Sequence, residues 1–323
     1  MSDVRAAFLA DAGWTNATES PVAGDLSTRK YTRLTRSGTT AILMECDPAT
    51  DTSLPDFLKM TAWLRDLGLS APEILASDAA TGTALLEDFG DAKLTKLIAD
   101  NPACQQPHYE TILDTLIAIR GAPAPDLPAP TASDLCGATL LADSWYPNAK
   151  SGLLDAFRVG LEPILADLLK APRTVSLRDF HADNIIWLSE GTPLKQPGLL
   201  DYQDAFLIHP AYDLMSLLTD ARTDVSTALQ VHLIDQYARK TGDDPASVAA
   251  AVATLGAQRN LRILGIFARA ARRDGKNQHL PAMARVHRHF MSCCAHPSLA
   301  PFSRDLATAL PAPTPALLES LAS

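Results

Sequence analysis

Two short apolar runs, residues 185–188 and 198–200, interrupt a chain that has a mostly helical pattern beyond residue 90. The link between the runs, SEGTPLKQP, has turn composition, so the two runs most simply pair as an antiparallel hairpin. Asn184 directly precedes the first run, and Asp201 directly follows the second. These two ends of an antiparallel pair lie side by side, so an amide oxygen and a carboxylate are predicted to converge at one edge.

Asp179 lies five residues before Asn184, in the segment that leads to the same edge. Two aspartates and an asparagine can supply oxygen ligands for Mg²⁺ and leave one carboxylate to orient a hydroxyl. Phosphoryl transfer by the kinase route uses such a set, with one Asp accepting the proton of the acceptor hydroxyl and the other two residues holding Mg²⁺. The spacing therefore predicts Asp179 as the catalytic residue and Asn184 and Asp201 as metal ligands, with ATP and Mg²⁺ as cofactors.

The first ninety residues have the pattern of a small mixed lobe. Residues 31–35 and 40–46 are predicted strands joined by a glycine-containing loop, a helix follows over 57–67, and residues 84–90 form a short strand that runs into a turn. Beyond residue 90, helical periods dominate, including the segments 153–170, 211–240, 245–273 and 281–294. We therefore expect an α+β chain with a small β-rich lobe over 1–90 and a mostly helical lobe over 91–323, which contains the predicted catalytic loop.

Several runs of residues carry a resemblance to a known family. The chain resembles the aminoglycoside phosphotransferase/choline kinase superfamily, whose fold is that of the protein kinases, with a small N-lobe and a larger helical C-lobe. The resemblance implies that residues 1–90 form the nucleotide-binding lobe and that residues 91–323 carry the catalytic loop and the substrate site. The family's H-G-D-x4-N loop matches residues 177–184 with its His and Gly replaced, its I-D motif matches Leu200-Asp201, and its D-L motif matches Asp213-Leu214. More narrowly, the runs DFHADNIIWL, GLLDYQDA, HPAYDL and AQRNLRILGIFARAARRDGK are similar to the bacterial anomeric sugar kinases of cell-wall recycling.

This resemblance implies an activity and two supporting residues. The similar enzymes phosphorylate the C1 hydroxyl of N-acetylmuramate and N-acetylglucosamine, so the resemblance implies an ATP-dependent sugar kinase. In the family, the aspartate that matches Asp213 anchors the catalytic loop from below, so Asp213 is expected to be structural. We expect His181 to brace the loop by hydrogen bonding rather than to act as the base, and Asp183 to be a loop or surface group.

The expected glycine-rich loop over the phosphates is weakly marked. The run AGDLSTRKYTRL contains Gly24 alone, with Ser27 and Thr28 at the expected tip of the loop. The third strand, TAILMEC, also lacks the lysine that normally holds the α- and β-phosphates, and Glu45 stands roughly in the expected place.

Another cation must therefore replace the missing lysine. Arg29, Tyr31 and Arg33 share one face of a strand by the two-residue period. If Tyr31 packs against the adenine, Arg29 lies toward the phosphates, and its planar fork suits phosphate oxygens. Arg29 is the predicted substitute, and the alternative is a solvated basic strand.

Two further sets of contacts are expected. Backbone groups of Glu87 and Phe89 fall where the hinge between the lobes should meet the adenine edge. The run from residue 258 to 262 offers polar groups on a helix, and Arg259, Asn260 and Arg262 are the expected sugar contacts, with one of the arginines meeting the lactyl carboxylate of N-acetylmuramate. Both arginines could equally be solvated helix residues.

Composition restricts the partners. The chain has 28 Lys and Arg against 37 Asp and Glu, a net charge of −9, which argues against a nucleic-acid partner. No window has the roughly 18 apolar residues of a membrane span. Charged residues in the N-terminal segment interrupt the apolar core that a signal peptide needs. The five cysteines lack metal-ligand spacing. We expect reduced thiols, a cytoplasmic location, and ATP and a small sugar as the partners.

Other functions stay open at this point. One is a metal-dependent phosphohydrolase with His181, Asp183, Asp201 and His209 as ligands, which leaves Asn184 and the N-terminal lobe without a role. Another is a non-catalytic pseudokinase, which the missing lysine suggests. Within kinases, the acceptor could also be choline, an amino acid or an aminoglycoside.

Overall fold

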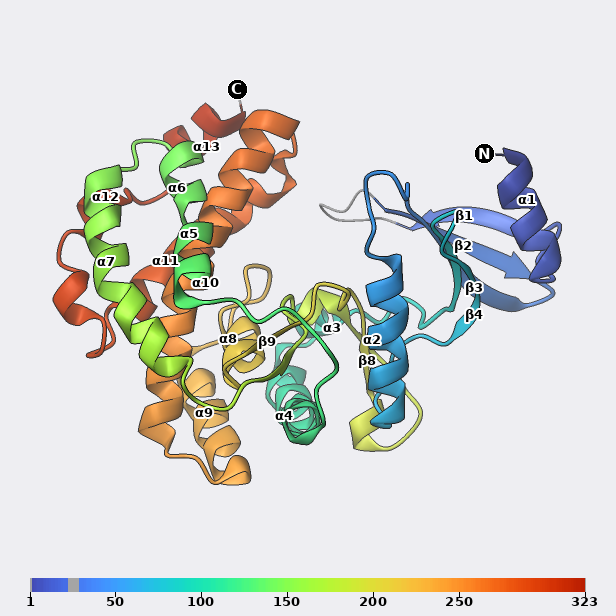
Figure 1. Ribbon diagram of the computed structural model, residues 1–323, viewed down its shortest axis with the longest axis horizontal. Coiled ribbons are helices and arrows are strands. Elements are labelled where there is room, and N and C mark those ends of the chain that lie inside the picture. Colours follow the sequence, from blue (N-terminus) through green and yellow to red (C-terminus); the bar gives the residue numbers. More distant parts are fainter. Residues whose placement is uncertain (1, 23–28, 323) are drawn as a thin grey trace. The chain divides into compact units, whose positions relative to one another are not determined.

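The computed structural model describes residues 2–22 and 29–322, and these residues form two compact units (Figure 1). The first unit comprises Met1–Leu97 and Asp183–Ala205, and the second comprises Ile98–Ala182 and Phe206–Ser323. The chain returns to the first unit over Asp183–Ala205. A single boundary at residue 90 leaves this segment out of the first unit. No helix among the described residues is long and apolar enough to cross a membrane.

The first unit is built on a five-stranded antiparallel sheet with the strand order β1-β2-β3-β5-β4. Its strands are β1 (Thr18–Val22), β2 (Lys30–Arg36), β3 (Thr39–Glu45), β4 (Ile74–Asp78) and β5 (Thr83–Glu87), and its helices are α1 (Ser2–Asp11) and α2 (Leu54–Asp66). The predicted hairpin between β2 and β3 is confirmed, with Arg36 opposite Thr39. Ser37 and Gly38 form its two-residue turn with φ of 51° and 83°, the left-handed pair that matches the twist of the strands.

The two faces of this sheet differ in what covers them. Leu34, Ala41, Leu43 and Leu85 form a buried cluster with Leu9 of α1. Because side chains alternate along a strand, Tyr31, Arg33 and Met44 belong to the opposite face.

This alternation corrects the expected position of Glu45. Glu45 shares the face of Ala41 and Leu43, and it accepts a hydrogen bond from Nε of Arg5 in α1 at 3.1 Å. The residue opposite Tyr31 is Met44, which is fully buried. If Tyr31 marks the adenine side, the lysine position is therefore filled by Met44, and no carboxylate of β3 faces the phosphates. The sequence did not show this, because TAILMEC is apolar on both faces and the two-residue period did not determine its register.

The predicted hairpin at residues 185–200 is also confirmed. Strands β7 (Ile185–Trp187) and β8 (Pro197–Leu199) pair antiparallel, with Ile185 opposite Leu199. They follow the 3₁₀ turn η2 (Ala182–Asn184) and enclose η3 (Pro193–Lys195). The segment is attached to the rest of the first unit through Tyr202, whose ring stacks on Phe57 of α2 with centroids 5.2 Å apart and whose hydroxyl lies 2.7 Å from the Thr61 hydroxyl.

The second unit is mainly helical, as predicted, and is organised around one long buried helix. That helix, α10 (Pro245–Asp274), packs against α6 (Leu140–Trp145), α8 (Tyr212–Leu218) and α11 (Met283–Cys294) (Figure 1). Gly265 permits the closest approach, because a Cβ atom there would lie 2.5 Å from the backbone nitrogen of Ala142 in α6. The other helices are α3 (Leu94–Asp100), which begins in the first unit, α4 (Gln105–Gly121), α5 (Ala132–Ala138), α6 (Leu140–Trp145), α7 (Ser151–Leu168), α8 (Tyr212–Leu218), α9 (Thr227–Thr241), α11 (Met283–Cys294), α12 (Leu306–Ala309) and α13 (Pro315–Ala322), with 3₁₀ turns η1 (Pro102–Cys104), η4 (Asn277–Ala282) and η5 (Ala300–Phe302).

One expected helix is divided in two. The period over residues 211–240 predicted a single helix, whereas α8 ends at Leu218 and α9 begins at Thr227. Asp220 accounts for the break, because its carboxylate accepts hydrogen bonds from the backbone amides of Ala182 and Arg222 at 3.1 and 2.8 Å. Asp competes in this way with helical hydrogen bonding. The break places a carboxylate under the loop that carries Asp179.

Candidate active site

The loop that carries Asp179 begins where a short sheet of the second unit ends. Strand β6 (Thr174–Ser176) pairs with β9 (Phe206–Ile208), and Asp213, in the first turn of α8, holds the end of β6. The Asp213 carboxylate accepts hydrogen bonds from the Ser176 hydroxyl at 2.6 Å and from the Leu177 amide at 2.8 Å. Burial raises the pKa of Asp213 to about 6 although these hydrogen bonds favour the ionised form. Asp213 thus lies where an anchor of the loop was expected.

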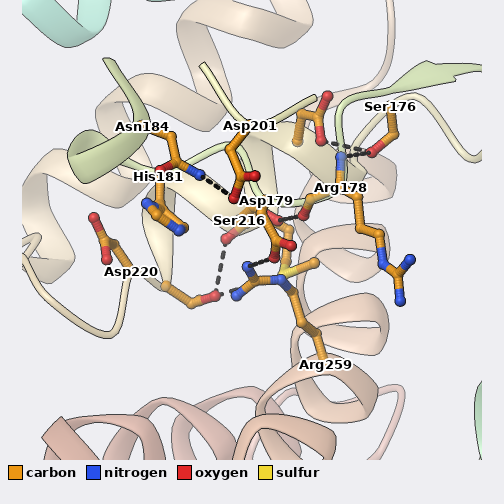
Figure 2. A network of polar contacts seen from close by, with 12 residues as sticks. Ser176, Arg178, Asp179, His181, Asn184, Asp201, Ser216, Asp220 and Arg259 are labelled. Carbon is orange, nitrogen blue, oxygen red and sulfur yellow. Dashed lines mark hydrogen bonds and ion pairs between the residues drawn. The ribbon is translucent and has the colours of Figure 1, made fainter. Parts of the chain in front are cut away.

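The Asp179 carboxylate is directed at a buried arginine of the core helix (Figure 2). Arg259 of α10 brings Nη2 within 3.3 Å of Oδ1 of Asp179, and the Arg259 side chain is only 4% exposed. Burial favours the neutral acid, but Arg259 and the other cations around the loop outweigh burial and lower the pKa of Asp179. A carboxylate that is ionised at neutral pH and still 40% exposed can accept a proton from an incoming hydroxyl.

His181 lies inside the same loop, against the segment that follows α8. Its Nε2 is 3.3 Å from Nη1 of Arg222, and its Nδ1 has no hydrogen-bond partner among the described residues. Burial and the Arg222 cation lower the pKa of His181, so the imidazole is neutral. Because Arg222 can only donate, Nε2 accepts and the ring proton is on Nδ1. These contacts agree with the expected bracing role.

In the first unit, the hairpin brings Asn184 and Asp201 together. Nδ2 of Asn184 donates to Oδ2 of Asp201 at 3.4 Å (Figure 2), and the Asn184 carbonyl accepts from the Leu200 amide at 3.0 Å. Asp201 has a φ of 58°, the left-handed conformation that few residues other than glycine adopt, and Gln203 donates to its Oδ1 at 2.9 Å. The two side chains thus lie together at the hairpin end, as the strand pairing predicted, and their role as metal ligands stays a prediction.

These two side chains fit Mg²⁺ as it is bound in phosphoryl-transfer sites. Mg²⁺ usually takes one or two carboxylates from the protein and completes its shell with phosphate oxygens and water. Asp201 offers an exposed carboxylate, and Asn184 beside it offers an amide oxygen. Among the residues in the described ranges, no group of three or more His, Cys, Asp or Glu side chains could hold a metal ion by itself.

Asp183, the neighbour of Asn184, has different partners. Its carboxylate accepts hydrogen bonds from Nζ of Lys93 at 3.1 Å and from the Thr95 hydroxyl at 2.8 Å. His209, another ligand of the alternative phosphohydrolase site, uses its Nδ1 to accept from the Ala211 amide at 3.2 Å. Both side chains already have hydrogen-bond partners in the protein, which leaves the phosphohydrolase site without support.

Arg29 lies at the start of β2, and its side chain is only 4% exposed. Its Nε donates to Oδ2 of Asp51 at 3.1 Å, and its Nη2 donates to the hydroxyl of Ser53, the N-cap residue of α2. Burial raises the pKa of Tyr31, with Arg29 acting in the opposite direction and the Asp201 and Asp51 carboxylates adding to the rise. The Arg29 guanidinium and Asp201 thus both act on the Tyr31 hydroxyl. Ser27 and Thr28 lie outside the described residues.

Two other expected nucleotide contacts have structural partners. The Glu87 amide donates to the Glu73 carbonyl at 2.9 Å, so this amide is not available to an adenine edge. The ring of Phe89 packs over Gly198 of the hairpin, where a Cβ atom would lie 2.8 Å from the ring. A contact of the Glu87 carbonyl or of Phe89 with adenine stays a prediction.

An ion-pair group that the sequence did not indicate joins β2 to the segment after β5. Arg33 donates to the carboxylates of Asp88 at 2.7 Å and Asp91 at 2.9 Å. Both aspartates are more than fifty residues away in sequence, so no local pattern could have revealed the contact.

The expected sugar contacts on α10 differ from one another. Asn260 is fully buried, and its Nδ2 donates to the Gly256 carbonyl at 2.8 Å, so it belongs to the core of the helix. Arg259 holds Asp179, as described above. Arg262, one helical turn further on, makes no hydrogen bond or ion pair with any residue that the structure describes.

Comparison with known proteins identifies the family of this chain. The sequence model of the phosphotransferase enzyme family matches residues 18–251. The chain belongs to this family. An N-acetylmuramate/N-acetylglucosamine kinase from Caulobacter vibrioides is 35% identical over 338 residues, covering 92% of this chain and 93% of that protein. A kinase of the same name from Pseudomonas aeruginosa is 30% identical, covering 89% and 87%.

The fold also agrees with a solved structure. The choline kinase LicA from Streptococcus pneumoniae has a TM-score of 0.64 to this chain, at 15% sequence identity and with 90% of this chain and all of that chain covered. At this identity the likeness concerns the fold alone. The family and the protein-kinase-like fold that the motifs predicted are confirmed, and the chain is a phosphotransferase.

Proposed function

We propose that the chain is an ATP-dependent kinase that phosphorylates the anomeric C1 hydroxyl of N-acetylmuramate, N-acetylglucosamine or both. Its main support is the pair formed by Asn184 and Asp201 at the hairpin end, with the ionised Asp179 five residues upstream in the chain. The names of the two similar kinases support an amino sugar as the acceptor. Its partners are ATP and this small molecule, with no nucleic acid, and the supply of ATP places the reaction in the cytoplasm.

In the proposed reaction, Asp179 accepts the proton of the acceptor hydroxyl. The hydroxyl oxygen forms a bond to the γ-phosphorus, the bond from that phosphorus to the bridging oxygen breaks, and ADP leaves with the electron pair. Arg259 keeps Asp179 ionised for this task. Asn184 and Asp201 would hold Mg²⁺, which neutralises charge on the phosphate oxygens when bound.

The charge around Asp179 favours this acceptor over the cationic alternatives. Arg178, Arg259 and Arg262 all act on the Asp179 carboxylate. Choline and aminoglycosides are cations, and three arginines beside the proton acceptor would repel them. A neutral or anionic sugar meets no such repulsion. The pseudokinase alternative leaves unexplained why both metal ligands and an ionised Asp179 are present.

An acceptor panel tests this function directly. The protein is incubated with Mg²⁺-ATP and N-acetylmuramate, N-acetylglucosamine, choline or an aminoglycoside, and the phosphorylated position is determined by phosphorus NMR. We expect a sugar 1-phosphate from one or both amino sugars and no product from the cationic acceptors. Phosphate on any other hydroxyl would contradict the anomeric assignment, and a phosphocholine product would overturn the sugar assignment.

The role of Asp179 has its own test. Asp179→Asn removes the proton acceptor and leaves both metal ligands, so we expect kcat to fall about 10²- to 10⁴-fold while the Kd of Mg²⁺-ADP changes little. Asp183→Asn is the matched control, since Asp183 is bound to Lys93 and Thr95, and it should retain most of the activity. Turnover of Asp179→Asn close to that of the wild type would contradict the assigned role.

A further inference from the structure

Three arginines of the second unit act on Asp179, and they differ in what else holds them. Cζ of Arg178 lies 5.9 Å from the centroid of the Phe206 ring. Arg259 is ion-paired to Asp179 itself. Arg262 has neither kind of contact with any residue in the described part of the chain.

The surroundings of Arg262 make its charge costly. Its side chain is partly buried on α10, three residues after Arg259 and so on the same face of the helix. Burial and the repulsion of Arg178 and Arg259 lower the pKa of Arg262, and the attraction of Tyr212 and Asp179 does not compensate. A guanidinium does not give up its proton in proteins, so the lowered pKa means that the charge is destabilised where it stands.

The carboxylates around this loop already have hydrogen-bond or ion-pair partners. Asp213 holds the Ser176 hydroxyl and the Leu177 amide, and Asp220 holds the amides of Ala182 and Arg222. Asp179 faces Arg259. A partly buried charge without a partner is unfavourable, whereas the same guanidinium offers five N–H donors in a fork that matches a carboxylate. The Arg262 guanidinium is therefore able to take an anionic ligand at this loop.

We infer that Arg262 binds the carboxylate of an anionic acceptor, the lactyl carboxylate of N-acetylmuramate, and that Arg259 is a positioning residue for Asp179. This inference rests on the proposed function and deepens it. N-acetylmuramate differs from N-acetylglucosamine by a lactyl ether on O3 of the same ring, so its carboxylate is the group that distinguishes the two sugars. Arg262 then sets the preference between them.

Another anion could come to the same place, because the γ-phosphoryl group of ATP also approaches Asp179 during transfer. An experiment can distinguish which of the two anions Arg262 contacts. A contact with the phosphoryl group serves every acceptor, whereas a contact with the lactyl carboxylate serves N-acetylmuramate alone.

The experiment measures kcat and KM of Arg262→Gln for both sugars and for ATP. We expect kcat/KM for N-acetylmuramate to fall about ten- to a hundredfold, mainly through KM, as for loss of charge-assisted hydrogen bonds. For N-acetylglucosamine and ATP the constants should stay close to those of the wild type, which also shows that the variant is folded. Arg262→Lys should restore part of the loss, because it keeps the charge without the fork.

Arg272→Gln is the matched control, since Arg272 is an exposed arginine of the same helix and loses the same charge. It should leave kcat and KM for both sugars unchanged. Equal losses for both sugars in Arg262→Gln would assign Arg262 to the phosphoryl group, and no loss for N-acetylmuramate would also overturn the inference. If the wild-type enzyme phosphorylates neither sugar, the proposed function and the lactyl assignment are overturned together. That result is distinct from a failure of the lactyl assignment alone.

Arg259 should show a different signature. Because its guanidinium lowers the pKa of Asp179, Arg259→Gln should move the acidic limb of the pH profile of kcat to higher pH. Its loss of kcat should be similar for the two sugars. A selective loss of N-acetylmuramate in Arg259→Gln would reverse the two assignments.

Discussion

At the scale of single residues, two aspartates at the catalytic loop have pKa values that are shifted in opposite directions. Arg259 and its neighbouring cations lower the pKa of Asp179, whereas burial raises that of Asp213 to about 6. Such a separation is typical of sites in which one carboxyl group does the chemistry and another supports it. Asp179 was identified by its spacing and Asp213 by the resemblance to the family, but the direction of each pKa shift depends on burial and on residues that lie far away in the chain.

The raised pKa of Asp213 predicts a pH-dependent component of stability. The carboxyl ionises near pH 3.8 in the unfolded chain but only near pH 6 in the folded protein, so the folded state binds more protons between these values. Its contribution is therefore full below pH 3.8 and decreases as pH rises to about 6, by about 3 kcal/mol. Urea unfolding of the wild type and of Asp213→Asn between pH 4.5 and 7 measures it. The stability advantage of the wild type should be larger at pH 4.5 than at pH 7, and a difference that does not vary with pH would contradict the assignment.

Residues with local signatures were found from the sequence, whereas long-range pairings between residues were not. Asn184 and Asp201 flank one hairpin, so strand pairing alone brings them together. Asp51, which holds Arg29, is separated from it by 22 positions and lies in a turn of ordinary composition. Arg262 was predicted as a sugar contact together with Arg259, but only the structure shows that it lacks a partner among the described residues.

At the scale of elements, strand register decides which side chains can face a nucleotide. The turn at Ser37 and Gly38 sets the register of β2 against β3 and places Met44, not Glu45, opposite Tyr31. Arg29 then lies just ahead of β2, next to the N-terminus of α2. Protein kinases pair their strand-three lysine with a glutamate of the following helix. Here a buried arginine and Asp51, just before the helix, form the corresponding kind of pair.

This arrangement sharpens the prediction for Arg29. Arg29→Ala removes the cation expected at the phosphates, so we expect kcat/KM for ATP to fall at least ~100-fold, roughly 2.7 kcal/mol. Arg29→Lys should recover part of it, because an ammonium lacks the bidentate fork. Asp51→Asn, which leaves the cation without its carboxylate, should raise KM for ATP by less than Arg29→Ala does.

Lys30→Ala is the matched control for Arg29. Lys30 is the next residue, is exposed and lies on the other face of the strand. It should change the rate little. Thermal unfolding of each variant separates lost binding from lost folding. If Lys30 is essential and Arg29 is dispensable in folded variants, the assignment of the cation fails.

At the scale of the whole molecule, the chain passes between its two units within the catalytic segment. The crossing lies between Ala182 and Asp183, so Asp179 belongs to the second unit and Asn184 to the first, and the chain returns to the second unit after Ala205. Hydrophobic periodicity predicted the β-rich and helical parts, because each has a consistent pattern. It could not predict this exchange, because the attachment of the hairpin depends on long-range contacts such as that of Tyr202 with Thr61.

The last prediction uses the stability of the whole protein as a measure of metal-dependent binding. Mg²⁺-ADP at about 100 times its Kd should stabilise the folded protein by about 2.7 kcal/mol and raise the Tm. Asp201→Asn weakens a direct ligand, so most of this rise should be lost, as it should be in the wild type when EDTA removes Mg²⁺. Asp183→Asn makes the same charge change beside Asn184 but disturbs only the contacts with Lys93 and Thr95. It should lower the Tm of the free protein slightly and keep the full rise with Mg²⁺-ADP. A rise that survives in Asp201→Asn but disappears in Asp183→Asn would move the metal site to the other carboxylate of the hairpin segment.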